Sequence, residues 1–305
     1  MSKRKELPRK KRQNKTSSVW LISIGLVLIL LFGSWAVFSR ARTANENALP
    51  ISQLTTNDFH SLAFSPTEPE TILFGHHDGL LISNNGGKDW NPGTLKNVDV
   101  MALAVPSSNP EIMYAAGHDV FYKSLDGGAT WESTQTNLPG SDIHGFAVDP
   151  EDDTKVFAHI VGYGLYGSQD GGHTWSVLSE NIPPSTYNLV VGENSRTLYA
   201  AAGDAGLWQS LDAGKTWSVI KNIPDNGAIA ANYARKNGRL YVTTIGNLAG
   251  LYVSDDNGQS WKSLGLDGIW LAAAVSPLDQ GHIVVINDKG QVFASRDGGE
   301  SWKDE

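Results

Sequence analysis

The chain has 305 residues, of which 40% are hydrophobic and 18% charged, a balance that is typical of globular proteins and excludes an intrinsically disordered chain. It contains no cysteine, which excludes disulfides and thiolate metal sites. The net charge of −8 is unevenly distributed, because residues 1–42 carry ten Lys or Arg and one acid, which leaves 14 basic and 31 acidic residues in 43–305. So acidic a domain would repel a phosphate backbone, and we expect no nucleic-acid partner.

The first feature along the chain is an uncharged stretch of 20 residues, Val19–Phe38. As a helix it would span about 30 Å, the thickness of a bilayer's hydrocarbon core. Eight basic residues precede it and only two follow, which predicts a cytoplasmic N-terminus. The alternative is a cleaved signal peptide, whose apolar stretch is normally only about 7–15 residues long. We therefore expect a single-pass protein of the cell membrane, with a basic cytoplasmic tail at 1–18, a transmembrane helix at 19–38, a polar stalk at 39–50 and an extracytoplasmic domain at 51–305.

The rest of the chain repeats the motif Ser-x-Asp-x-Gly-x-Thr-Trp six times, with steps of 41 to 44 residues. The copies depart from it mildly: Asn85 replaces Asp, Asp89 replaces Thr, and Ser260 and Ser301 replace Thr with another hydroxyl residue. The six copies lie at 83–90, 124–131, 168–175, 210–217, 254–261 and 295–302. A period near 42 is the length of one four-stranded propeller blade. Short β-rich runs separated by Pro, Asp and Gly surround each motif, as expected for four strands per repeat. The sequence therefore predicts an all-β, six-bladed β-propeller.

Little chain follows the sixth motif, so the last blade would lack its outer strand. The segment Pro50–Leu54 has a strand-like sequence and precedes the first repeat. We expect it to pair with the sixth blade, since closing the ring in this way removes an open sheet edge.

The conserved spacing within each motif suits a tight turn between the third and fourth strands of a blade. Glycine permits positive φ, Ser and Asp can bond to backbone amides, and Trp brings a large apolar surface to the turn. We assign this turn-forming role to Ser83, Asn85, Trp90, Ser124, Asp126, Trp131, Ser168, Asp170, Trp175, Ser210, Asp212, Trp217, Ser254, Asp256, Trp261, Ser295, Asp297 and Trp302.

The motif resembles the Asp box, or BNR repeat, of sialidases, xyloglucanases and sortilin-type receptors, and the resemblance covers residues 57–305. It implies that the boxes lie at the periphery, away from the ligand. The run Asp-x-Asn-Gly at 255–258 is similar to part of a calcium loop but lacks the later Glu that such a loop requires. We assign no metal ligand and no cofactor.

Ligands of propellers usually meet the face formed by the loops that join one blade to the next and the second strand of a blade to the third. Acidic, histidine and aromatic residues of this sequence gather in those loops. The candidate ligand-binding residues are Asp58, His60, His76, His77, Asp78, His118, Asp142, His144, Tyr163, Tyr187 and Trp270. Two interpretations stay open: ordinary turn chemistry, in which Asp precedes a strand, and a binding or metal site built from Asp and His.

The resemblance raises two kinds of enzyme. Sialidases grip a substrate carboxylate with three arginines, whereas residues 43–305 contain only four arginines and one of these lies inside a box, so a sialidase is disfavoured. Xyloglucanases use paired carboxylates, and Asp58, Asp99 and Asp142 are the candidates here. Equivalent positions on adjacent blades should be about 10 Å apart, which could only approach the roughly 6.5–9.5 Å of inverting glycosidases.

Relatives without enzymatic activity fit the sequence better. Sortilin-type receptors bind peptides. Photosystem II assembly factors use a similar propeller near a membrane, but their basic patch has no counterpart in this sequence. We therefore expect a module that binds a protein, peptide or glycan on this face or assists assembly, with a xyloglucanase-like glycoside hydrolase as the alternative.

Overall fold

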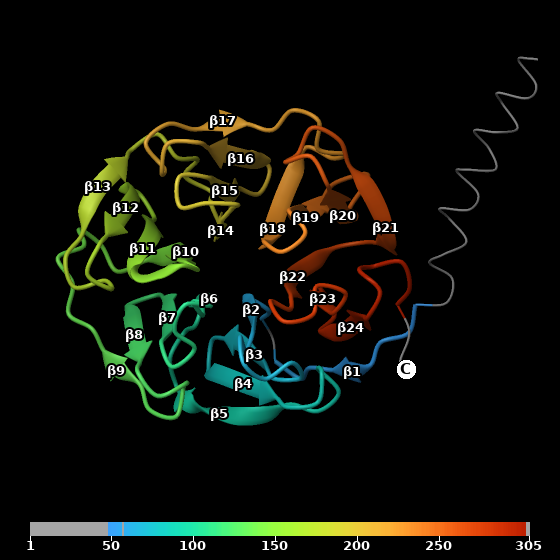
Figure 1. Cartoon of the computed structure of the whole chain (residues 1–305), viewed down its shortest axis with the longest axis horizontal. Helices are drawn as coiled ribbons and strands as arrows, with labels where there is room; N and C mark the ends of the chain where they lie inside the picture. Colours follow the sequence, from blue (N-terminus) through green and yellow to red (C-terminus); the bar gives the residue numbers. More distant parts are fainter. Residues whose placement is uncertain (1–47, 57, 303–305) are drawn as a thin grey trace, which may run out of the picture. The chain divides into compact units, whose positions relative to one another are not determined.

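The computed structural model describes residues 48–56 and 58–302, and these form six four-stranded antiparallel sheets arranged in a ring (Figure 1). The prediction of an all-β, six-bladed propeller is confirmed. The predicted tail, the predicted membrane helix and residues 39–47 of the predicted stalk lie outside the described residues. Within the described part of the chain, no helix could cross a membrane.

Consecutive strands build each blade from the centre of the ring outward. The strands are, blade by blade, β2 (Ser61–Phe64), β3 (Ile72–His76), β4 (Gly79–Ser83) and β5 (Asn91–Lys96); β6 (Ala102–Ala104), β7 (Met113–Gly117), β8 (Val120–Ser124) and β9 (Glu132–Ser133); β10 (Ile143–Asp149), β11 (Asp152–Ile160), β12 (Gly164–Ser168) and β13 (Ser176–Ser179); β14 (Asn188–Val191), β15 (Leu198–Ala201), β16 (Leu207–Ser210) and β17 (Ser218–Val219); β18 (Gly227–Ala234), β19 (Arg239–Ile245), β20 (Gly250–Ser254) and β21 (Lys262–Asp267); and β22 (Trp270–Val275), β23 (Ile283–Asn287), β24 (Gln291–Ser295) and β1 (Ser52–Gln53).

The core lies between the blades, because each sheet packs face to face with its neighbours. Every residue of β3 and of β7 is buried, which a strand covered on both faces requires. Tyr114, Phe121 and Phe146 belong to one cluster that joins the second and third blades, with ring centroids 5.6 to 6.0 Å apart. The hydrophobic repeat in the sequence thus becomes a continuous ring of interblade contacts.

The ring is closed by the segment that precedes the first blade, as predicted. Strand β1 pairs with β24 at the outer edge of the sixth sheet (Figure 1), with Ser52 opposite Val292. Two further backbone bonds of 2.8 Å flank the pair, from Ile51 N to Val292 O and from Leu54 N to Gly290 O. The outer edge of β24 is therefore covered by a strand from the other end of the domain.

Each Asp box forms the turn between the third and fourth strands of its blade. In the second blade, Ser124 Oγ donates to Asp126 Oδ1 and accepts from Gly128 N, both at 2.8 Å, while Asp126 Oδ1 also accepts from Thr130 N at 2.8 Å. Gly127 and Gly128 have φ of 68° and 85°, which an L side chain rarely adopts. The same Ser–Asp–Gly bonds recur in the third to fifth boxes.

These bonds also hold the box carboxylates in their charged form. The side-chain hydrogen bond from Thr216 is the largest cause that lowers the pKa of Asp212 to about 2, and the bond from Ser260 does the same for Asp256. The acidic residues of the boxes are thus engaged within their own turns.

Candidate functional site

The candidate acids and histidines lie at the end of the blades opposite the Asp boxes. Asp58 and His60 precede β2, and His77 lies in the tight turn from β3 to β4. In an antiparallel blade these loops emerge at one end, while the turns after the first and third strands emerge at the other. The face therefore collects side chains from loops far apart in the sequence.

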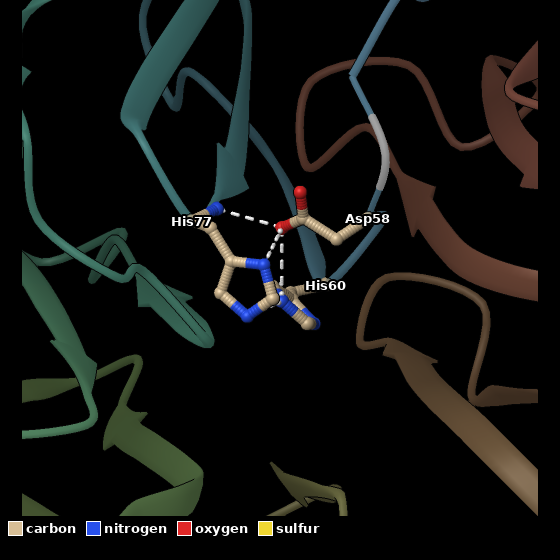
Figure 2. A group of neighbouring side chains, drawn as sticks. All are labelled: Asp58, His60 and His77. Carbon is tan, nitrogen blue, oxygen red and sulfur yellow. Dashed lines mark hydrogen bonds and ion pairs between the residues drawn. The ribbon is translucent and has the colours of Figure 1, made fainter.

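Asp58, His60 and His77 form a first cluster (Figure 2). Asp58 Oδ2 accepts a hydrogen bond of 2.6 Å from the backbone N of His77 and lies 3.0 Å from His60 Nε2 and 3.2 Å from His77 Nδ1. The two imidazole rings meet edge to face, with centroids 4.7 Å apart. The carboxylate of Asp58 thus anchors both rings and the loop that carries one of them.

His118, Asp142 and His144 form a second cluster, which joins the loops of the second and third blades. Asp142 Oδ1 lies 3.0 Å from His118 Nε2 and 3.0 Å from His144 Nε2, and the two nitrogens are 3.1 Å apart. An isolated β-bridge between His118 and Asp142 fixes the two loops against each other. Three potential ligand atoms therefore face one another within this cluster.

Asp99 lies between the two clusters and connects them. Its Oδ2 is 2.6 Å from His118 Nδ1 and 3.6 Å from His77 Nε2. Gly117 allows this approach, because a Cβ built there would stand 2.0 Å from the backbone oxygen of Asp99. Three carboxylates and four imidazoles thus alternate in one continuous group, which we call the Asp/His network: Asp58, His60, His77, Asp99, His118, Asp142 and His144.

Burial and charge act in opposite directions on the histidines of the network. Burial is the largest influence on His60 and His144 and lowers the pKa of each, while Asp58 and Asp142 respectively act to raise it. Both rings are therefore held mainly neutral near pH 7, as ring nitrogens with available lone pairs must be.

The network stands at one mouth of a central channel of about 590 Å³. The first strand of every blade lines this channel, and His60, His144 and Tyr187 line it at the network's end. The ring of Tyr187 stacks on that of His144, with centroids 6.0 Å apart and an interplanar angle of 22°. Near the boxes' end, Arg235 Nη2 binds Glu151 Oε1 at 2.6 Å, joining the fifth blade to the third.

Two of the predicted ligand-binding aromatics are exposed on this face. Tyr163, in the loop between β11 and β12, and Tyr187, just before β14, have exposed fractions of 50% and 49%. Aromatic rings that keep half their surface in solvent are suited to contact a ligand.

Besides Tyr163 and Tyr187, three more predicted residues lie outside the network: His76, Asp78 and Trp270. The ring of Trp270 is 4% exposed and packs against Phe293, with ring centroids 5.1 Å apart, so the prediction that it binds a ligand is wrong. His76 is buried, stacks on Phe74 and accepts a hydrogen bond from the backbone N of Asp78, which is itself exposed. His76 is the last residue of β3 and is buried, whereas His77 lies in the turn that follows and reaches Asp58 and Asp99.

From the sequence, Asp99 was predicted only as a candidate catalytic acid. In the structure, Asp99 lies at the centre of the Asp/His network. A usable signal was present, since Asp58, Asp99 and Asp142 are separated by 41 and 43 residues, close to the blade period. Equivalent loops of adjacent blades therefore each contribute one of these acids. Asp225, at a related position, instead accepts backbone bonds from Asn226 and Leu248 and serves its own loop.

Comparisons with known proteins agree with the repeat pattern. A family model described as photosynthesis system II assembly factor YCF48 matches residues 41–189, and the model of the BNR/Asp-box repeat matches residues 252–263. The chain is a BNR-repeat β-propeller. No curated protein matches this BNR-repeat propeller.

Solved structures share its fold. The GH74 enzyme of Niastella koreensis superposes with a TM-score of 0.61 at 20% identity, over 83% of this chain and 46% of that one. A structure of YCF48 bound to D1 peptide gives 0.53 at 18% identity over 83% of each chain, and YCF48 from Cyanidioschyzon merolae gives 0.52 at 16% identity over 84% and 87%. This BNR-repeat propeller spans about half the length of the GH74 chains that it matches.

Proposed function

We propose that this BNR-repeat propeller is a membrane-tethered binding or assembly module that holds a segment of another protein on the face carrying the Asp/His network. The observation that carries the proposal is the combination of half-exposed Tyr187 with the network at one mouth of the central channel. Ligand sites are typically concave, with aromatic surface and a few placed polar groups. Exposed tyrosines are also frequent anchors in protein interfaces.

The class of ligand is proposed from a protein of similar fold. YCF48 has been solved bound to D1 peptide, and its chain matches this one over 83% of both lengths. A polypeptide segment is therefore the first ligand class to test here. The two chains are only 18% identical overall, so the sequence of the segment that binds here has to be determined for this chain itself.

The alternative is a glycoside hydrolase, which the fold shared with GH74 enzymes favours. Glycoside hydrolysis needs one protonated acid and one free carboxylate on either side of the bond. Here Asp58 and Asp142 each lie within 3.2 Å of two imidazole rings, and Asp99 lies between one ring of each pair, His77 and His118. Carboxylates engaged in this way are poorly placed as an acid and base pair, which supports binding over hydrolysis.

The tether is proposed from the sequence of residues 19–38 and the basic residues before them. In membrane fractions the full chain should resist extraction by salt and alkali. On intact cells, added protease should remove the propeller, whereas a cytoplasmic propeller would survive.

Binding and hydrolysis are separated by two assays on the full chain. Peptides from the loops of membrane proteins are titrated against it and followed by fluorescence anisotropy. We expect Tyr187→Ala to weaken binding about tenfold or more, as for an interface anchor, and Leu125→Ala on a box turn to leave it unchanged.

In parallel, xyloglucan and other β-glucans are incubated with the protein and reducing ends are measured. Hydrolysis that is lost in both Asp58→Ala and Asp142→Ala would overturn the proposal.

A further inference from the structure

The geometry points to a metal site in the second cluster. We propose that His118, Asp142 and His144 bind one divalent transition-metal ion of the zinc type, and that Asp99 orients His118 toward it. The inference goes beyond the proposed function and stands whether or not this face binds a protein.

The three ligand atoms are already arranged around a common point. His118 Nε2, His144 Nε2 and Asp142 Oδ1 are separated by 3.0, 3.0 and 3.1 Å. Zinc bonds of about 2.0–2.2 Å to nitrogen and oxygen place tetrahedral ligands roughly 3.3 Å apart. Shifts of a few tenths of an ångström therefore convert this triangle into one face of a zinc tetrahedron.

Asp99 sets which nitrogen of His118 faces the cluster. His118 Nδ1 lies 2.6 Å from Asp99 Oδ2, and an ionised carboxylate can only accept a hydrogen bond. Donation from Nδ1 to Asp99 leaves Nε2 of His118 facing Asp142 and His144, with its lone pair available to a metal ion. A carboxylate behind a ligating imidazole is the usual second layer of a zinc site.

This arrangement leaves the cluster short of a positive partner. Asp142 Oδ1 is enclosed, and the groups that reach it are two imidazole nitrogens 3.0 Å away, of which only Nε2 of His144 is available as a donor. An enclosed carboxylate oxygen that also faces a lone pair, as it does at Nε2 of His118, is costly. A metal ion would bind Asp142 Oδ1 and the lone pair of His118, and it would bind Nε2 of His144 once the proton of that ring is on Nδ1.

The first cluster provides a contrast within the same molecule. Asp58 Oδ2 already accepts the backbone hydrogen bond from His77. His77 Nδ1 lies 3.2 Å from Asp58 Oδ2, while its Nε2 lies 3.4 Å from His60 Nε2 and 3.6 Å from Asp99 Oδ2. The first cluster therefore differs from the second in that its carboxylate oxygen has a backbone donor, and His60 serves as the matched control.

The ligand set also limits the kind of ion. Two imidazoles and one carboxylate suit zinc and related transition metals, whereas calcium and magnesium prefer oxygen ligands alone. Three protein ligands leave a fourth position open. Since His118 and Asp142 are both nearly half-exposed, that position is open to water or to a group of a bound ligand.

The test measures metal binding by the full chain after treatment with a chelator. Zinc is added, metal content is measured by mass spectrometry, and affinity is measured by calorimetry. We expect one ion per chain, at least a tenfold loss of affinity in His118→Ala, His144→Ala and Asp142→Asn, and a roughly 10–100-fold loss in Asp99→Asn. His60→Ala removes the same ring from the first cluster and should retain the ion.

Cobalt provides a second readout that does not depend on the stability of any variant. The wild-type chain with cobalt should show the intense visible absorption of a tetrahedral site, and excess zinc should remove it. Each variant is first compared with the wild type by circular dichroism without metal. Absence of binding by the wild type, binding that survives both His118→Ala and His144→Ala, or binding lost in His60→Ala would overturn the proposal.

Discussion

Arg296 and Glu70 join the last Asp box to the first blade through a paired ion contact. Arg296 Nη1 lies 2.8 Å from Glu70 Oε1 and Arg296 Nη2 lies 2.6 Å from Glu70 Oε2, across 226 residues of sequence. The hydrogen bond from Arg296 is the largest cause that lowers the pKa of Glu70. With β1, this contact closes the ring, at the end of the blades away from the Asp/His network.

The first prediction concerns this contact. Both side chains are about two-fifths exposed, so solvent screens the pair and its coupling should be modest, about 0.5–1 kcal/mol. A double-mutant cycle of Glu70→Gln and Arg296→Gln, followed by urea unfolding, measures it. Arg239 and Asp255 form a single contact of 2.7 Å within one blade and should give a smaller coupling. Equal coupling energies for the two ion pairs would contradict the expectation that the paired contact of Glu70 with Arg296 is the stronger one.

The second prediction concerns the strand that closes the ring. Leu54 is 4% exposed and belongs to the cluster between the first and sixth blades, whereas Leu49 is 68% exposed. Leu54→Ala should lower the free energy of unfolding by about 2–5 kcal/mol, as for other buried leucines. Leu49→Ala makes the same chemical change and should stay within about 0.5 kcal/mol of the wild type. Similar effects of the two substitutions in urea unfolding would contradict the closure.

The third prediction concerns the Asp boxes. Ser124→Ala removes the acceptor of the buried Gly128 N–H and the donor to Asp126. The free energy of unfolding should fall by about 1–3 kcal/mol, because a buried donor is left without a partner. Ser133→Ala, on exposed strand β9, is the control and should change little. Ligand binding should be the same in both variants, since the boxes lie at the far end of the blades.

The fourth prediction concerns pH. Burial lowers the pKa of His159 and of His282 to about 4, and Arg296 adds to the effect on His282. The unfolded chain then binds protons that the folded chain does not, so stability should fall as pH drops from about 6.5 to about 4, by up to about 1.4 kcal/mol per pH unit for each histidine. Unfolding of the wild type and His282→Gln at about pH 7.5 and about pH 5 tests this. Between these two pH values, the free energy of unfolding should change less in the variant than in the wild type. An equal change in both proteins would show that His282 does not contribute to the pH dependence.

Nearly all of the fold could be predicted from the sequence, because each blade repeats the same pattern of strands and turns. Six boxes with a fixed period predicted six sheets, and the strand-like segment Pro50–Leu54 predicted the closure seen at β1. The contact between Glu70 and Arg296 was not predicted, since two charged residues 226 positions apart carry no local signal.

The candidate site was predictable in place and only partly in composition. Loop equivalence brought Asp58, Asp99 and Asp142 to one face, as their spacing implies. Side-chain direction was not predictable, because it depends on where each strand ends. His77 therefore lies in the network while His76 is buried, and Trp270 packs into the core. Which nitrogen of His118 faces Asp142 likewise depends on the contact with Asp99, which only the three-dimensional arrangement reveals.

We propose that the functional face of the propeller is the one with the Asp/His network and not the one with the Asp boxes. Site-specific photo-crosslinking in living cells tests this most directly, with the photoreactive residue at Tyr187 or, on a box turn, at Leu125. We predict one discrete protein adduct from position 187, absent from position 125 and competed by unlabelled wild-type protein but not by Tyr187→Ala. Adducts from position 125 alone would contradict the account.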